Sequence, residues 1–479
     1  MDNKTCIKQN TELNMLDNSF AFKSISELVT SIKRREISPI ELLELMQSRI
    51  DQFDDSINSF LSLNPHSRQE AEASEQSVMK GESSGPLCGI PFSVKDIIET
   101  RSLPTTGGSK VFGKGLQAAH DADVVKHLRQ AGGILLGKTN LHEFAFGITS
   151  ENEHFGPVRN PWNLNHVAGG SSGGSAAAVV MGMSIGSIGT DTRGSIRIPS
   201  ACCGATGLKP TLNAVSTKGV LPLSWTLDHV GPITTSVWDA AILVSVASGQ
   251  ANLLEKYESA LAAQIGKFRI GVCPYFFVDV DPVVESSLES AIEIFKGAGV
   301  EIVSVEIEGL DDALEASDII GRAEAVTIHD ANLSQKPDCY GSKVRERLSS
   351  GYRVTGIDLV RAERIRLKTI EAFRRAFLQV DCLVAPTLPV VAPPLGTEIV
   401  RSGNREEAIV NQFVRFNAPQ NVAGLPALAL PCGFTENSLP IGMQLIAWRG
   451  REELLFNLGA HFQRTTKWHQ MRPPLAELT

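Results

Sequence analysis

Several common features are scarce or absent in this sequence, and each absence excludes a class of protein. Positive charge is not in excess, because 45 Lys and Arg residues stand against 53 Asp and Glu residues and give a formal net charge of −8. This balance argues against a protein that binds nucleic acid or an anionic membrane through its overall charge. No stretch of about 18 or more apolar residues occurs, so no membrane span is expected. Residues 1–17 are polar and lack the apolar core of a signal peptide, so a cytoplasmic protein is expected.

Cysteine is also sparse, with eight residues among 479 and no CxxC pair. This scattered spacing speaks against a disulfide framework or a zinc site, and we expect neither a metal nor any other cofactor. The adjacent Cys202 and Cys203 lie close behind a glycine- and serine-rich loop, and we interpret them as small buried packing residues.

Apolar strand patterns alternate with helical patterns along most of the chain, which is typical of an α/β protein with a buried sheet. The sequence shows no fixed-period repeat and no clear linker, so one large domain is favoured. The pattern predicts helices at 24–34, 38–53, 121–131, 172–183, 282–298, 358–380 and 451–465. It predicts strands at 87–93, 133–136, 185–188, 268–273, 301–305, 382–385, 427–430 and 441–446.

The most informative feature is a pair of stretches rich in glycine and serine, residues 169–175 and 189–195. Serine supplies a nucleophile, and glycine lets backbone N–H groups approach a reacting atom. A flexible linker has a similar composition. However, most of the residues between the stretches are apolar and small and should be buried, which a linker would not be. We therefore interpret both stretches as parts of an active site.

Three short motifs point to other enzymes, and each lacks its required context. Residues 132–139 match the phosphate-loop pattern GxxxxGK[ST], but the four middle residues read as a strand preceded by a helix, the wrong order for such a loop. Residues 142–146 begin a zinc-binding HExxH motif, but Phe146 replaces the second histidine. Residues 169–173 fit the GxSxG motif of α/β-hydrolases, but residues 160–165 before them read as a turn, not a strand.

Lys95 follows the predicted strand at 87–93 and allows two interpretations. It could be a surface lysine paired with the neighbouring Asp96. It could instead be a buried lysine that has lost its solvation, and the resulting fall in pKa would let it act as a base.

Ten short stretches of the chain, which include parts of the glycine- and serine-rich pair, carry a family resemblance. They are 94–96, 137–140, 142–144, 160–162, 169–178, 189–191, 194–199, 203–204, 207–211 and 439–444. Together they resemble the amidase signature family of serine hydrolases, over nearly the whole chain from about residue 24. The resemblance implies a single domain at 21–479 with its signature core at about 85–215, after a tail at 1–20. It also implies a central twisted mixed β-sheet covered by helices on both faces.

The same resemblance implies a Ser-Ser-Lys triad. Lys95 matches the base and Ser195 the nucleophile, while Ser171, 24 residues before Ser195, matches the serine that relays the proton. Ser171 is preferred over Ser172 because the family's bridging serine is the first of the pair and follows a cis peptide bond. Serine is a weak nucleophile until a base takes its proton, and lysine serves as that base only when neutral.

The resemblance further implies that backbone N–H groups of the loop 192–195 stabilise the oxyanion, namely those of Thr192, Arg193, Gly194 and Ser195. Arg193 departs from the family, in which this loop commonly reads Asp-Thr-Gly-Gly-Ser. It is either an outward-pointing arginine on a tolerant loop or a charge that orients an anionic substrate or a neighbouring carboxylate such as Asp191.

The substrate pocket is expected where the residues before Asn160 meet the late segments of the chain. By resemblance, Ala145, Gly147, Thr149 and Ser150 are candidates for one wall. Apolar surface is expected from three aromatic residues that could equally be ordinary core, and such a pocket suits a hydrophobic or aryl amide. These residues are Trp225, Phe413 and Phe416.

The sequence therefore predicts an amidase that acts alone on a small amide, with no nucleic acid or membrane as partner, and it allows for a homodimer. The segments 224–229 and 416–421 resemble those of stand-alone amidases. The main alternative is the glutamine-hydrolysing component of a tRNA-dependent amidotransferase, in which the position of Arg347 holds the carboxylate of glutamine. A binding protein without catalysis is a third alternative.

Overall fold

A computed structural model describes residues 17–82 and 85–477. The tail expected at 1–20 lies mostly outside this part, but Asn18–Phe22 forms a short 3-10 helix in which Ala21 is buried. The first two helices, α1 (Ile25–Lys33) and α2 (Pro39–Ile57), begin after Ser24 and Ser38. Each serine accepts the N–H of a glutamate three residues on, whose carboxylate binds back to the serine N–H.

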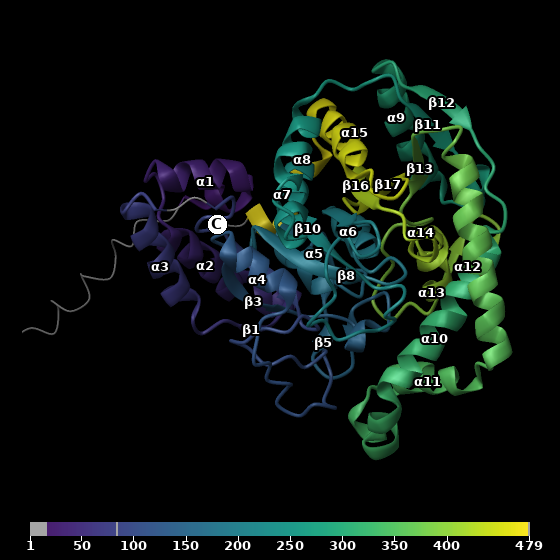
Figure 1. Cartoon of the computed structure of the whole chain (residues 1–479), viewed down its shortest axis with the longest axis horizontal. Helices are drawn as coiled ribbons and strands as arrows, with labels where there is room; N and C mark the ends of the chain where they lie inside the picture. Colours follow the sequence, from purple (N-terminus) through teal and green to yellow (C-terminus); the bar gives the residue numbers. More distant parts are fainter. Residues whose placement is uncertain (1–16, 83–84, 478–479) are drawn as a thin grey trace, which may run out of the picture.

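A mixed sheet of eleven strands runs through the molecule (Figure 1) and confirms the predicted fold class. The pairs β2–β3, β2–β8, β11–β12 and β11–β13 are parallel, and the remaining pairs are antiparallel. In spatial order the strands are β1 (Phe60–Leu63), β3 (Ile134–Thr139), β2 (Pro91–Lys95), β8 (Gly186–Asp191), β10 (His229–Thr234), β9 (Thr206–Lys209), β16 (Ala427–Phe434), β17 (Pro440–Ala447), β13 (Cys382–Pro386), β11 (Arg269–Val272) and β12 (Glu301–Ser304).

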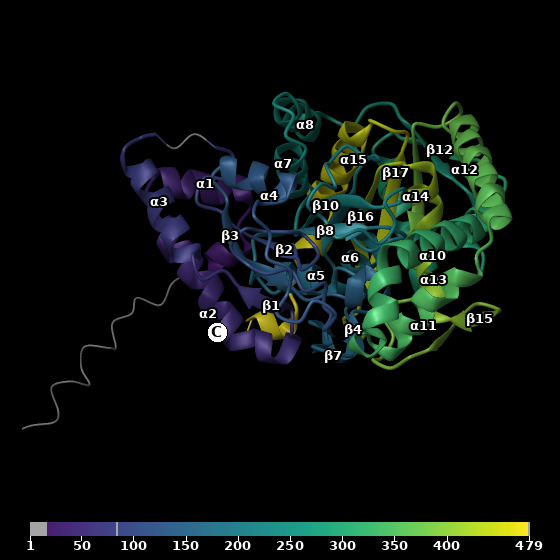
Figure 2. The ribbon, with the colours of Figure 1, turned by 60° about the horizontal axis from the view of Figure 1, so that its bottom comes forward.

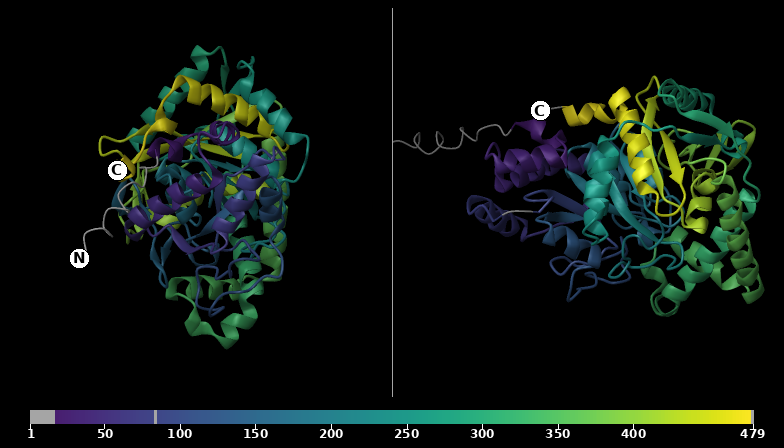
Figure 3. Two further views of the ribbon diagram at one scale, coloured as in Figure 1. Left: turned by 90° about the vertical axis from the view of Figure 1, so that its left-hand side faces the viewer. Right: turned by 45° about the horizontal axis from the view of Figure 1, so that its top comes forward.

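Helices cover both faces of the sheet, as Figures 2 and 3 show from other directions. Strand β8 shows both covered faces, because residues three apart in a strand face opposite sides of the sheet. Gly186 lies against Leu243 of α7 (Val237–Ala247), while Gly189 lies against Ser172 at the start of α5 (Gly173–Val180). The other helices around the sheet are α3 (Ser67–Met79), α4 (Asp123–Gln130), α6 (Arg197–Cys203), α8 (Leu253–Ala262), α9 (Pro282–Gly297) and α15 (Glu452–Thr465).

A group of helices at one end of the molecule, green to yellow-green in Figure 1, forms a layer beside the strands that come from the C-terminal half of the chain. Its longest member is α10 (Leu310–Gln335), which packs against α12 (Gly356–Ala376). The smaller members are α11 (Ser342–Ser350), α13 (Ile409–Arg415) and α14 (Ala418–Ala423). Three short hairpins lie outside the main sheet: β4–β5 (Glu151–Asn152, Gly156–Pro157), β6–β7 (Arg159–Asn160, Asn163–Val167) and β14–β15 (Ile399–Ser402, Arg405–Ala408).

The two ends of the described chain lie close together. Arg49 of α2 joins them, because it donates hydrogen bonds from Nη1 to Asn18 Oδ1 over 3.1 Å and from Nη2 to the carbonyl oxygen of Ala476 over 3.0 Å. Figures 1 and 2 show the C-terminal end beside the purple N-terminal helices. No helix in the described ranges is long and apolar enough to cross a membrane.

Every helix and strand predicted from the sequence occurs, with shifted ends, but several elements were not predicted. Strands β9 and β10 lie inside the sheet yet contain Gly207, Gly231 and Pro232, residues that are depleted in strands. The turn expected at 160–165 is instead mostly the hairpin β6–β7. This hairpin does not join the main sheet, so the strand–turn–helix context of an α/β-hydrolase is still missing.

Candidate active site

The three residues expected to form the triad come from one edge of the sheet. Lys95 is the last residue of β2, and the loop with Ser195 follows β8, which pairs with β2 in parallel. The carboxyl ends of parallel neighbours meet at the same sheet edge, so these two residues are brought together by topology. Ser171 precedes α5, whose residues pack on the same two strands.

Lys95 is fully buried, and its Nζ donates hydrogen bonds to Ser171 Oγ over 2.7 Å and to Thr190 Oγ1 over 2.9 Å. Burial lowers the pKa of Lys95 to about 7, against the opposing effect of the carboxylates of Asp228 and Asp191. The pairing of Lys95 with Asp96 considered above is wrong, because Asp96 pairs with the buried Lys138 at 3.3 Å. Lys95 therefore has a large neutral fraction at neutral pH.

The Ser171 loop is held by backbone contacts on both sides. The Gly170–Ser171 peptide bond is cis, as the family resemblance implied. The Ser171 carbonyl accepts the N–H of His142 at 3.2 Å and the hydroxyl of Ser150 at 3.3 Å. Ser150 is fully buried and also accepts the N–H of Gly173, so it supports this loop. The expectation that Ser150 lines the pocket is wrong, because its side chain hydrogen-bonds to that loop and lines neither of the two cavities described below.

Asp191 organises the loop that carries Ser195. Its carboxylate accepts the N–H of Gly194 at 2.7 Å and pairs with Arg197, whose Nε lies 3.0 Å away. Burial acts to raise the pKa of Asp191, but Arg197, Lys209 and Asn421 together hold it below its usual range. Gly194 has φ +124°, a conformation that glycine adopts and other residues rarely do.

The predicted set of oxyanion donors loses one member, because the N–H of Gly194 is already engaged by Asp191. The N–H groups of Thr192, Arg193 and Ser195 have no acceptor among the residues that the structure describes. The Thr192 hydroxyl donates to Asp228 over 2.6 Å, which ties the loop to the segment 223–228. Burial raises the pKa of Asp228 to about 6, so this carboxyl is largely ionised at neutral pH.

Ser195 lies beside the Ser171 loop, and only 5% of it is exposed. Its carbonyl accepts the N–H of Ser172 at 3.2 Å. No hydrogen bond joins its Oγ to Ser171 or to any other residue in the described part of the chain. Lys95 contacts the hydroxyl of Ser171, whereas the hydroxyl of Ser172 donates to the Thr190 carbonyl. Lys95 is thus hydrogen-bonded to Ser171, whereas no hydrogen bond joins the side chains of Ser171 and Ser195.

A cavity of about 290 Å³ opens onto Ser195 and the loop before it. Residues 145–148 meet late segments from α10, α13 and residues 347–353 there, as the sequence predicted. Ala145, Gly147 and Arg347 line this cavity, and Thr149 lines an adjoining one of about 590 Å³ that shares Gly147 and Arg347.

The three aromatic residues do not line these cavities. Phe413 and Phe416 are fully buried in the core, and Trp225 is 53% exposed on the surface. The expectation of an apolar, aryl-binding surface from these side chains is therefore wrong.

Arg193 reaches into the cavity, so it is not an outward-pointing arginine, and it does not contact Asp191. Its Nη1 lies 3.0 Å from the carboxylate of Asp318 on α10, which also pairs with Arg322 at 2.8 Å. Asp191 is unavailable because Arg197 occupies it. The carboxylate named in one of the two interpretations, Asp191, is therefore wrong, and the carboxylate that Arg193 contacts is Asp318.

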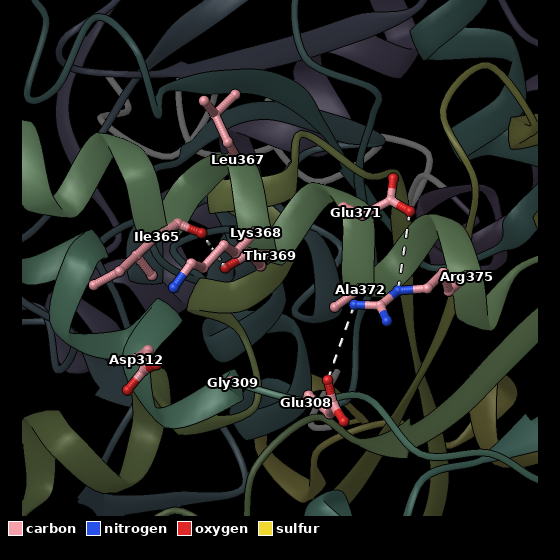
Figure 4. Close-up of a pocket in the computed structure, with 10 residues that line it drawn as sticks. All are labelled: Glu308, Gly309, Asp312, Ile365, Leu367, Lys368, Thr369, Glu371, Ala372 and Arg375. Carbon is pink, nitrogen blue, oxygen red and sulfur yellow. Dashed lines mark hydrogen bonds and ion pairs between the residues drawn. The ribbon is translucent and has the colours of Figure 1, made fainter.

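A third cavity, of about 580 Å³, lies between α10 and α12 (Figure 4), away from these residues. Among its charged side chains, Arg375 lies 3.9 Å from both Glu308 and Glu371. It contains none of the predicted site residues, so we do not assign catalysis to it. Within the described ranges, no cluster of three or more His, Cys, Asp or Glu side chains is placed to hold a metal.

Sequence reasoning missed Thr190, Asp228 and Asp318. Thr190 and Asp228 lie within stretches that carry the family resemblance, 189–191 and 224–229. A polar residue at a buried strand end beside a serine loop is a usable signal for a role in the site. Asp318 lies on α10, which the sequence did not predict, so no signal placed it near Arg193.

Known proteins resemble this chain over most of its length. The family model described as Amidase matches residues 41–456. The chain is 35% identical to the A component of the Glutamyl-tRNA(Gln) amidotransferase of Halothermothrix orenii, covering 94% of this chain and 99% of that one. A solved structure of an amidase superposes with a TM-score of 0.86 at 34% identity, covering 92% and 100%. A bacterial aryl acylamidase superposes with a TM-score of 0.85 at 26% identity, covering 94% and 97%.

The chain belongs to the amidase signature family. Within that family it is an amidohydrolase.

Proposed function

We propose that this protein hydrolyses the C–N bond of a small carboxylic amide through an acyl-serine intermediate, with Lys95 as base, Ser171 as relay and Ser195 as nucleophile. The observation that carries the proposal is the buried Lys95, with its lowered pKa, at 2.7 Å from Ser171 and beside the loop of Ser195. A lysine that is neutral near pH 7 can accept a proton, which a solvated lysine cannot do.

The proton path runs in both directions during one cycle. The Ser195 hydroxyl passes its proton to Ser171 Oγ as Ser171 passes its own to Lys95 Nζ, and Ser195 Oγ bonds to the amide carbon. The reverse path delivers that proton to the leaving nitrogen as the C–N bond breaks, so the amine leaves neutral. Water then attacks the acyl-enzyme by the same route and releases the acid. The step requires Ser195 Oγ to turn toward Ser171 when substrate binds, since that contact is open.

The N–H groups of Thr192, Arg193 and Ser195, which have no acceptor among the described residues, stabilise the negative charge on the tetrahedral oxygen. Asp191 supports this role indirectly, since its hydrogen bond to Gly194 shapes the loop. Loss of one such donor in other enzymes costs about 10²–10³ in kcat.

Labelling with a fluorophosphonate tests the nucleophile. We expect the reagent to modify Ser195, identified by mass spectrometry of the labelled peptide, and Ser195→Ala to abolish both labelling and amide hydrolysis. Ser171→Ala should lower kcat/KM by about 10²–10⁴, the usual range for a lost acid–base group. Ser175→Ala is the matched control, because Ser175 is equally buried but bonds to Thr139. Normal labelling of Ser195→Ala would refute the assignment.

A second candidate is the glutamine-hydrolysing component of a tRNA-dependent amidotransferase. It is supported by the names of the curated relatives and by Arg347, which lines the cavity and, by resemblance, matches the residue that holds the glutamine carboxylate. We favour the stand-alone amidase because of the resemblance of segments 224–229 and 416–421. A glutaminase assay with and without the other amidotransferase components separates the two, since only the second candidate gains activity from partners. The homodimer stays a prediction.

A further inference from the structure

The cavity at Ser195 is strongly basic. Four arginines line it, Arg193, Arg322, Arg347 and Arg353, against a single carboxylate, that of Asp318. Arginine stays protonated throughout the pH range of a working enzyme. A cavity of about 290 Å³ with this excess of positive charge favours an anion, and a neutral apolar ligand would leave the charges uncompensated.

The one carboxylate is shared by two of these arginines. Arg193 Nη1 binds Asp318 Oδ1 at 3.0 Å, and Arg322 Nε lies 2.8 Å from Oδ2. Asp318 therefore fixes both guanidinium groups at the cavity wall. The Nε of Arg193 is buried and has no hydrogen-bond partner among the described residues. A buried N–H without an acceptor is costly, so Asp318 leaves part of the hydrogen-bonding capacity of Arg193 unused.

We propose that Arg193, held by Asp318 and backed by Arg322, binds a carboxylate of the substrate, and that this substrate carries no ammonium group beside that carboxylate. The chemical class is the monoamide of a small dicarboxylic acid. The proposal rests on the amide hydrolysis proposed above and specifies its substrate.

The second half of this proposal follows from the same ion pairs. An α-amino acid with a side-chain amide, such as glutamine, carries an ammonium group on the carbon next to its carboxylate. That ammonium would lie among arginines, and the only lining carboxylate is already engaged by two of them. The ammonium and the guanidinium groups carry like charges, which repel strongly in a poorly solvated site.

Five glutamates line the adjoining cavity, and all of them except Glu346 accept a backbone N–H or pair with a lysine; Glu151, for example, accepts the N–H of Gly396. Glu143 accepts the N–H of Gly341, Glu153 accepts the N–H of Ser342, and Glu398 pairs with Lys343. These carboxylates are therefore poorly placed to receive a substrate ammonium.

Three amides of matched length test the proposal. Glutaramate (the monoamide of glutaric acid) has the carboxylate, pentanamide lacks it, and glutamine adds the α-ammonium. We expect kcat/KM for glutaramate to exceed that for each of the others by about ten- to hundred-fold, as for a hydrogen bond to a charged group. If pentanamide or glutamine is hydrolysed as well as glutaramate, amide hydrolysis stands and this inference is overturned.

Variants assign the effect to Arg193. In Arg193→Met the ratio of kcat/KM for glutaramate to that for pentanamide should fall about ten- to hundred-fold, and Arg193→Lys should restore part of it. The ratio cancels any general loss from disturbing the loop. Arg322→Met, on the helix α10, should lower the same ratio and serves if Arg193→Met does not fold. Arg345→Met is the control, since Arg345 pairs with Asp338 on the surface and does not line the cavity. An unchanged ratio in Arg193→Met and Arg322→Met would overturn the proposal.

Binding separates this inference from the proposed reaction. Calorimetry with Ser195→Ala should show glutaramate binding more tightly than pentanamide, and the added change Arg193→Met should remove the difference. If wild type hydrolyses no amide but this binding pattern holds, the proposed function fails and the carboxylate site stands. If glutaramate and pentanamide bind equally, the carboxylate site fails.

Discussion

Asp191 and Arg197 form an ion pair in which neither side chain is exposed, with Nε of the arginine 3.0 Å from Oδ2 of the aspartate. The same carboxylate receives the N–H of Gly194 and the side-chain amide of Asn421. The pair therefore connects the end of β8, the first turn of α6 and the helix α14. The pair fixes the loop that carries Ser195, although neither of its two side chains lines the cavity.

Removing Arg197 should be strongly destabilising. Arg197→Met leaves the Asp191 carboxylate buried without its counter-ion, and breaking a buried pair in this way costs about 3–5 kcal/mol. We expect a fall of that size in the free energy of unfolding, measured by denaturant titration. Arg374→Met is the matched control, because Arg374 pairs with Glu371 on the exposed face of α12 and such pairs contribute about 0–1 kcal/mol. Equal losses in the two variants would contradict the role given to the buried pair.

Activity should depend on pH through Lys95. Its pKa is lowered to about 7 by burial, and only the neutral amine can accept the proton. As pH falls below about 7 the amine is protonated, so kcat/KM on a neutral amide should drop towards tenfold per pH unit. Above about 7 it should level off. Measuring kcat/KM on pentanamide from pH 5 to 9 checks this, and a profile flat down to pH 5 would exclude Lys95 as the base.

The position of that pH limb should depend on Asp228. The charge of Asp228 raises the pKa of Lys95, so Asp228→Asn should move the limb to lower pH. Asp239→Asn is the matched control, because Asp239 is also buried with its pKa raised to about 6, but it binds the N–H of Ile25. The midpoint of the profile is the readout, since the link from Asp228 to Thr192 also affects the absolute rate. A shift of equal size in both variants would contradict the electrostatic explanation.

The alternation of strands and helices could be predicted because large apolar residues mark those elements in the sequence. Helix α10 could not, because small and polar residues such as Ser317, Gly321 and Glu324 interrupt the large apolar residues of its buried face, and its periodicity is weak. Asp318 lies on that helix, 125 residues from Arg193, so the partner of the unusual arginine was out of reach.

The motif residues show a similar division. Glycine and serine spacing located the loops of Ser171 and Ser195, since those residue types report local backbone demands. The same spacing did not show that Ser150 supports the Ser171 loop or that Asp191 uses the N–H of Gly194. These are contacts between distant segments, which the local pattern does not record.

Gly147 joins the cavity wall to the Ser171 loop, and an added methyl group there should affect both. A Cβ at this position would overlap the ring of His142, whose backbone N–H binds the Ser171 carbonyl. The ring is half-buried and neutral at pH 7, because desolvation and the charge of Arg347 lower its pKa to about 3. Gly147→Ala should therefore cost about 1–3 kcal/mol of stability, as overpacking does, and reduce kcat as the ring displaces the loop.

A glycine in open space provides the comparison for Gly147. Gly297, the last residue of α9, has no atom within 4 Å of an added Cβ. Gly297→Ala should be neutral or stabilising by up to about 1 kcal/mol, because alanine is the better helix former. Melting temperature and kcat, measured on both variants, check the prediction. If Gly147→Ala matches Gly297→Ala in both, the His142 ring can move aside freely, and it then has no part in positioning Ser171.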